Sequence, residues 1–131
     1  MQDRYLFRGK TISGEWLIGL LAVKDGKYYI NNKVGRPFAY EIRPETICQC
    51  TGLKDDNNNL IFENDILFLK DKINGIEWKA IVRFGNPNGE YYYGWQLVPI
   101  VEFDGNRDIL LWVETETEYM KCEVIGNKFD N

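Results

Sequence analysis

The stretch Leu20–Ile30, LLAVKDGKYYI, places the pair Asp25-Gly26 between two apolar runs. Asp-Gly readily adopts the positive φ values of a two-residue type I′ turn, whose twist matches that of two antiparallel strands. The stretch therefore predicts a β-hairpin. On its N-terminal side the run Glu15–Val23, EWLIGLLAV, is apolar enough to indicate a longer and more buried strand.

A second hairpin is predicted between residues 66 and 84. Residues 66–71 alternate in two sets, Ile66, Phe68 and Lys70 on one face and Leu67, Leu69 and Asp71 on the other. Asn74-Gly75 supplies a turn. The return strand places Trp78, Ala80, Val82 and Phe84 on one face and Glu77, Lys79, Ile81 and Arg83 on the other. This period of two is typical of half-buried antiparallel strands.

The rest of the chain follows the same pattern of short strands and turns. Further strands are predicted at 4–10, 38–43, 45–52, 91–103, 107–114 and 118–127, separated by Gly, Asn and Pro turns. Many short strands without a long helical period predict an all-β protein, a barrel or a sandwich. A length of 131 residues, with 44% hydrophobic residues, fits one folded domain over 1–131.

Composition also narrows the function. No export signal or membrane span is recognisable, so we expect a cytoplasmic protein that does not bind membranes. The chain has no histidine, the commonest general base and metal ligand, so we expect no enzyme and no cofactor. Cys48, Cys50 and Cys122 are predicted to be thiols rather than disulfides, and without a fourth ligand they make an incomplete zinc site.

Charge divides the chain into two halves. Residues 1–54 hold nine Lys or Arg against five Asp or Glu, a net of +4, whereas residues 55–131 hold seven against fifteen, a net of −8. Such complementarity favours packing of one half on the other, within a chain or between subunits. A basic half that binds nucleic acid is the alternative.

Three motifs have the residue types of chemical sites. The cluster Asp55–Asn59, DDNNN, has oxygen ligands at calcium-loop spacing, but Leu60 and Ile66 stand where glycine and a chelating glutamate are needed, so it predicts a turn. Three carboxylates alternate at Glu114, Glu116 and Glu118, which favours a solvated edge strand over a metal-dependent acid–base site.

Aromatic residues alternate in Glu90–Leu97, EYYYGWQL, where Tyr91, Tyr93 and Trp95 would share one strand face. Such residues pack in cores and at subunit contacts, and they also stack on nucleic-acid bases. With Lys24 and Lys27 they are the candidate binding residues.

Several motifs together resemble the YopX family of bacteriophage and prophage proteins. They are FRGK at Phe7–Lys10 with Trp16 after it, PETICQCTGLKDDNNNLIFENDIL at Pro44–Leu67, and EVIGN at Glu123–Asn127. Asn64 and Cys48 stand where the family tends to have glycine. The resemblance implies a mainly β protein, with an N-terminal β portion over 1–59 and a portion similar to a small SH3-type barrel over 60–131. It implies a phage gene expressed in a bacterium, and no catalytic residue.

These observations predict a non-enzymatic phage accessory protein that binds a host or phage protein and forms a homo-oligomer. The alternative is a nucleic-acid-binding barrel, with phosphates contacted by Arg4, Arg8, Lys10, Lys24 and Lys27 and bases by Tyr91, Tyr93 and Trp95. A metal-dependent enzyme built on Glu114, Glu116 and Glu118 is the third reading.

Overall fold

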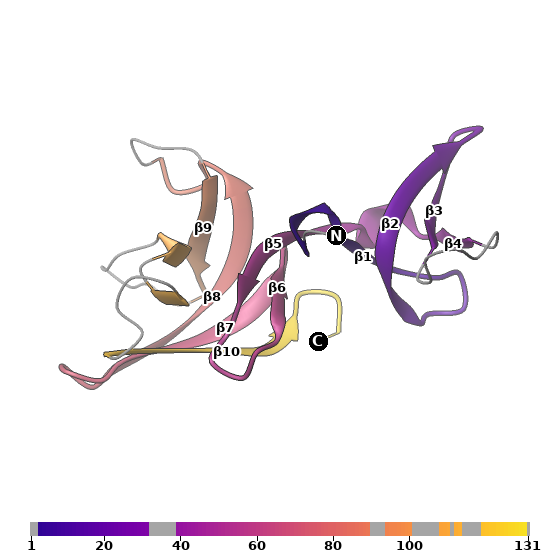
Figure 1. Cartoon of the computed structure of the whole chain (residues 1–131). Helices are drawn as coiled ribbons and strands as arrows, with labels where there is room; N and C mark the ends of the chain where they lie inside the picture. Colours follow the sequence, from indigo (N-terminus) through magenta and orange to yellow (C-terminus); the bar gives the residue numbers. More distant parts are fainter. Residues whose placement is uncertain are drawn as a thin grey trace. The chain divides into compact units, whose positions relative to one another are not determined.

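The protein is mainly β and divides into two compact units, Met1–Gly52 and Leu53–Asn131 (Figure 1). The computed structural model describes residues 3–31, 39–89, 94–100, 108–110, 112–113 and 119–130. The prediction of a mainly β fold is confirmed.

The N-terminal unit is built from five short antiparallel strands in the order β4-β3-β2-β1-β5. They are β1 (Phe7–Lys10), β2 (Trp16–Lys24), β3 (Lys27–Asn31), β4 (Tyr40–Ile42) and β5 (Cys48–Lys54), the last of which ends in the second unit. Two 3-10 turns, η1 (Asp3–Tyr5) and η2 (Pro44–Thr46), precede β1 and β5. An isolated bridge between Thr11 and Ile42 joins the end of β1 to β4, which curls the sheet.

One face of this sheet forms the core of the N-terminal unit. Ile30 and Ile42 are buried there, and Gly9 lies against them so closely that an added Cβ would overlap Ile42 Cγ2. Glycine is therefore required at this position by packing.

The predicted hairpin is confirmed at the β2–β3 connection. Asp25 has φ 53° and Gly26 has φ 77°, the two positive values that define a type I′ turn. The prediction that β2 is a buried strand is wrong, because Ile18, Leu20 and Val23 are exposed. An apolar run does not reveal which face of a strand a neighbouring element covers.

The C-terminal unit holds a four-stranded antiparallel sheet in the order β10-β7-β8-β9. Its strands are β7 (Asp65–Asp71), β8 (Ile76–Gly85), β9 (Gly94–Pro99) and β10 (Met120–Asn127), and β6 (Leu60–Phe62) pairs with β5. The predicted alternation in β8 is confirmed, since Trp78, Ala80 and Val82 are buried while Glu77, Lys79 and Arg83 are exposed.

The core of the C-terminal unit lies on the face of the sheet that carries Trp78. Its buried members are Ile61, Leu67, Leu69, Trp78, Ala80, Val82, Leu97, Ile109, Trp112 and Cys122. The rings of Trp78 and Trp112 meet edge to face at 5.6 Å between centroids. Each large apolar side chain buried in this way contributes about 1.5–3 kcal/mol to folding.

Two local predictions are wrong. The strand expected over 107–114 contains helical backbone at Ile109 and Leu110, because the Asp108 carboxylate accepts a bond of 3.0 Å from the Leu110 N–H in the manner of a helix cap. The strand expected over 4–10 begins only at Phe7, since Arg4 and Tyr5 lie in η1.

The two sheets share an arrangement that the sequence does not show as a repeat. The N-terminal sheet contains the order β5-β1-β2-β3 and the C-terminal sheet has the order β10-β7-β8-β9. In both, a strand from later in the chain pairs with the first of three strands that are consecutive in sequence. Among the described residues of the C-terminal unit, β9 and β10 remain the two ends of the sheet, and no pairing joins them into a barrel.

Candidate binding face of the N-terminal sheet

The strand register gathers basic and apolar side chains on the outer face of the N-terminal sheet. Residues that pair across antiparallel strands point to the same face. The pairs are Arg8 with Ile18, Lys10 with Trp16, Leu20 with Asn31, Ala22 with Tyr29 and Lys24 with Lys27. We call the surface formed by Arg8, Lys10, Trp16, Ile18, Leu20, Ala22, Lys24 and Lys27 the basic face. Ile30 stands between Tyr29 and Asn31 in β3. Successive residues of a strand point to opposite faces, so the side chain of this core residue lies on the face opposite to the basic face.

Trp16 is held on this face by two cations. The guanidinium carbon of Arg8 lies 4.9 Å from the ring centroid of Trp16, and Nζ of Lys10 lies 5.2 Å from it. Nε and Nη2 of Arg8 are buried, so its contact is worth up to about 2 kcal/mol, and the contact of the half-buried Lys10 is worth about 0.5–1 kcal/mol. The indole ring therefore fixes the positions of two positive charges at the β1–β2 end of the face.

An aliphatic row runs along β2 between the cations. Ile18 and Leu20 are 44% and 46% exposed, and Ala22 is exposed as well. Single exposed apolar residues are ordinary on protein surfaces, but a contiguous row framed by charge is typical of an interaction surface.

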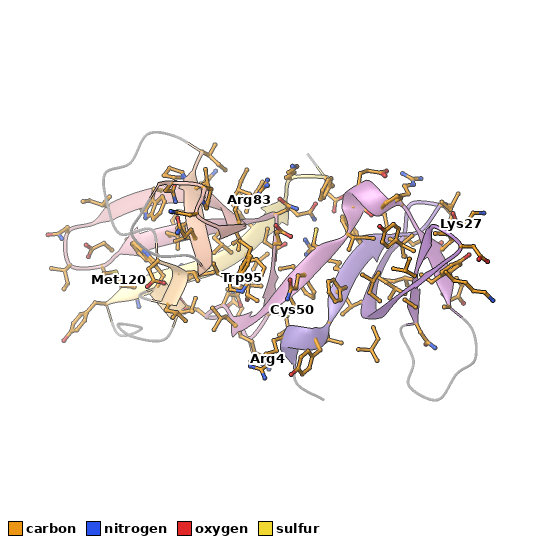
Figure 2. All side chains as sticks on the ribbon, turned by 90° about the horizontal axis from the view of Figure 1, so that it is seen from above. Arg4, Lys27, Cys50, Arg83, Trp95 and Met120 are labelled. Carbon is orange, nitrogen blue, oxygen red and sulfur yellow. The ribbon has the colours of Figure 1, made fainter. Side chains whose placement is uncertain are left out.

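Two lysines stand at the other end of the face. Lys24 and Lys27 are directly paired in register on either side of the Asp25-Gly26 turn. Glu41 Oε1 lies 4.0 Å from Nζ of Lys27, with 61% and 40% of the two side chains exposed, so this ion pair contributes little. Like charges directly opposite each other on a sheet are destabilising. Lys27 is labelled in Figure 2.

The structure distributes the predicted binding residues over two units. Lys24 and Lys27 lie together on the basic face, as do Arg8 and Lys10, whereas Arg4 lies in η1 with its guanidinium carbon 5.1 Å from the Tyr5 ring centroid. Trp95, labelled in Figure 2, belongs to β9 of the C-terminal unit.

Trp95 acts as a packing residue of the C-terminal unit. It meets Phe84 edge to face at 4.9 Å and also packs against the hydrophobic core. Phe84, predicted on the core side, is 60% exposed at the end of β8. Tyr91 and Tyr93, like Glu114, Glu116 and Glu118, lie outside the described residues.

Sequence reasoning missed Trp16, Ile18 and Leu20 as surface residues. The available signal was the alternation of Trp16, Ile18, Leu20 and Lys24 within one strand next to a type I′ turn. This alternation defines a face, although it does not say whether the face is covered.

The Asp-rich motif is a turn, as predicted, and it fastens a distant strand. The Asp55 carboxylate accepts bonds from the N–H groups of Asn57 (3.0 Å), Asn59 (2.8 Å) and Val124 in β10 (2.8 Å). Asp56 Oδ2 accepts a bond of 3.0 Å from the N–H of Cys122. These carboxylates occupy the edge of β10 that does not pair with β7. Their role in the structure is to satisfy backbone donors.

Asn64 occupies a position between β6 and β7 where the backbone is left-handed. It adopts φ 71°, a left-handed conformation that glycine takes freely and asparagine tolerates better than most residues. Its N–H donates to Val82 O at 2.8 Å and its carbonyl accepts from Lys128 N at 2.9 Å. Two main-chain hydrogen bonds therefore hold Asn64 in this left-handed conformation.

The cysteines offer no reactive thiol. All three are buried, and none forms a disulfide, as predicted. Burial, together with the nearby carboxylates of Asp56, Asp55 and Glu123, raises the pKa of the Cys122 thiol to about 12. In the part of the chain that the structure describes, no cluster of three or more His, Cys, Asp or Glu side chains could hold a metal ion.

Fold and surface together define a two-unit, mainly β protein with a basic, partly aliphatic face on its N-terminal sheet. The sequence model of the YopX protein family matches residues 13–131, nearly the whole chain, and the chain belongs to that family. No curated protein and no solved structure matches it. Within the described residues, no helical segment has the length and apolarity that crossing a bilayer requires.

Proposed function

We propose that the protein is a non-enzymatic accessory protein of a phage or prophage, acting in the bacterial cytoplasm, that binds another protein through the basic face. The observation that carries this proposal is the exposed aliphatic row of Ile18, Leu20 and Ala22, framed by Arg8 and Lys10 at one end and by Lys24 and Lys27 at the other. Apolar centres with charged rims are the usual anatomy of protein interfaces.

The shape that presents this face is, in this proposal, a small SH3-like barrel. The family resemblance assigns such a barrel to residues 60–131. The N-terminal unit supports the same architecture in its own right, because it has five antiparallel strands, a 3-10 turn before the fifth, and a bridge from β1 to β4. The matching strand order of the C-terminal sheet supports a second unit of this kind.

Site-specific photo-crosslinking tests the protein-binding role. A photoreactive amino acid at Leu20 is compared with one at Ile125, which is 49% exposed on β10 of the other unit. We expect a discrete protein adduct from position 20 in bacterial cells, lost when Lys24 is also changed to Glu, and none of the same mass from position 125. Adducts that do not depend on position, or no adduct at position 20, would contradict the proposal.

Nucleic-acid binding is the second candidate, because four of the five cations assigned to it, Arg8, Lys10, Lys24 and Lys27, do share one face with Trp16. If these four contacted phosphates of a single strand, log K would fall with log salt with a slope of about −2.8. Fluorescence anisotropy with a mixed-sequence oligonucleotide measures this slope. Against this candidate, the net charge of the chain is −4.

A further inference from the structure

The pairing of Lys24 with Lys27 indicates an anionic partner for the basic face. The backbone register places Lys24 opposite Lys27 across an exposed hairpin, and like charges in such pairs cost stability. Lys27 has Glu41 Oε1 4.0 Å from its Nζ, whereas the register gives Lys24 no acidic neighbour across the strand pair. A partner carboxylate beside Lys24 would remove that cost. The half-buried Lys10 adds positive charge to the same face, and Arg8 lies beside it with its Nε and Nη2 buried.

The aliphatic row indicates that the anionic partner is a protein. Ile18 and Leu20, about half exposed, gain from burial against other apolar side chains. Single-stranded nucleic acid gains instead by stacking bases on open aromatic rings. The indole of Trp16 already has Arg8 and Lys10 within 5.2 Å of its centroid, which makes it a poor stacking platform.

We propose that the occupant of the basic face is the acidic C-terminal unit of a second copy of this chain. This inference rests on the proposed function and names the partner. The N-terminal unit, residues 1–52, carries a net charge of +3 and the C-terminal unit, residues 53–131, a net charge of −7, so the same sequence supplies a partner of opposite charge. Electrostatic complementarity of this kind selects the partner and fixes orientation.

The contact is head to tail rather than face to face. A symmetric dimer of two basic faces would bring Lys24 and Lys27 of both copies together, and like charges across an interface are unfavourable. A heterologous contact between the basic face of one copy and the acidic unit of the next avoids this. Such contacts close into rings or extend into filaments.

The test is the mass of the full-length protein by light scattering and sedimentation over a range of concentrations, at low salt and at about 1 M salt, where the Debye length is about 3 Å. We expect a low-salt oligomer that dissociates at high salt. Lys24→Glu should raise the concentration at half-assembly by about tenfold, because it removes an attraction and adds a repulsion at the interface.

Lys24→Glu is also informative because it should not unfold the protein. It replaces a repulsion of Lys27 by an attraction, so the melting temperature of the monomer should be unchanged or higher. Lys72→Glu, at an exposed turn of the C-terminal unit, makes the same change in net charge and should leave assembly unchanged or slightly stronger. Leu20→Thr, which keeps a strand-forming residue, should weaken assembly without changing the melting temperature.

The possible outcomes separate the two proposals. A monomer at every concentration in low salt overturns the second-copy inference, and so does an oligomer equally weakened by Lys24→Glu and Lys72→Glu. If that monomer still gives a position-20 crosslink to a different protein, only the second-copy inference is lost. If it gives no crosslink, the protein-binding function is lost with it. If the wild-type monomer gains mass with an oligonucleotide and the Lys24→Glu variant does not, the face binds nucleic acid.

Discussion

Replacing Asp55 with alanine should destabilise the C-terminal unit more than any other single change in the Asp-rich turn. The Asp55 side chain is 7% exposed, and it accepts the N–H of Val124 at 2.8 Å and those of Asn57 and Asn59 at 3.0 and 2.8 Å. Alanine leaves the strand donor of Val124 without this acceptor, at a cost of about 1–3 kcal/mol. The two turn donors are at an exposed loop where water replaces the carboxylate, at about 0.5 kcal/mol each.

The expected loss in free energy of unfolding is thus about 2–4 kcal/mol, a large part of the stability of a small unit. Asp56→Ala is the matched control. Asp56 is exposed, its side chain accepts one bond from Cys122 N, and its own N–H still donates to Cys122 O at 3.0 Å after the change. We expect a loss of about 0.5–1.5 kcal/mol for this variant.

Urea unfolding followed by tryptophan fluorescence measures the difference in the free energy of unfolding between the two variants. Trp78 and Trp112 report on the core of the C-terminal unit, and a variant with Trp16→Phe removes the N-terminal signal. The midpoint should fall with the slope m unchanged. An Asp55→Ala loss below about 1 kcal/mol, or one no larger than that of Asp56→Ala, would refute the claim that this carboxylate fastens β10.

Three further predictions concern other positions. Asn64→Ala should cost about 1–2 kcal/mol because alanine is strained at φ 71°, whereas Asn64→Gly should stay within about 0.5 kcal/mol, as thermal unfolding would show; equal losses would contradict the backbone argument. Cys122 should resist iodoacetamide at pH 8 in the folded protein and react once urea unfolds it, since its thiol pKa is raised to about 12; mass spectrometry that found rapid native labelling would exclude this. Bonds from the Asn74 side chain and from the backbone of Asn74 and Ile73 lower the pKa of Asp71 below 3.8, so its contribution to stability is present above the unfolded pKa and is lost as pH falls through the lower folded pKa. The stability difference between wild type and Asp71→Asn should therefore be constant from pH 7 to about 5 and shrink below pH 4, and a difference independent of pH would count against it.

Local patterns predicted the hairpins and the strand faces because their causes are local. Asp25-Gly26 determines a turn by its own backbone preferences, and the alternation from Trp78 to Val82 reflects a period of two. The hydrogen bond from the Val124 N–H to the Asp55 carboxylate could not be predicted in the same way. Val124 is 69 residues away from Asp55, and nothing in DDNNN distinguishes a turn that satisfies only itself from one that also holds another strand.

Two wrong predictions share one physical origin. The runs around Leu20 and Ile109 are both apolar, and for this reason the first was predicted to be buried and the second to be a strand. A bond from the Leu110 N–H to Asp108 gives helical backbone in one of them, and the other is a strand with one uncovered face. The composition of a run shows how favourable it is to remove its side chains from water. Whether a side chain caps the run as a helix, or another element covers one face of it, depends on groups outside the run.

Two polar residues of the segment Pro44–Leu67 have roles in folding, and for that reason they do not identify a ligand. Asp55 fastens β10, and Asn64 supplies a left-handed residue between β6 and β7. The hairpin end of the basic face has no comparable role in folding, because the pairing of Lys24 with Lys27 opposes folding and the exposed Leu20 contributes little to the core. Some residues lower the stability of the isolated chain or do not contribute to it, and a binding partner accounts for their presence. The function of this protein is therefore best sought on that face.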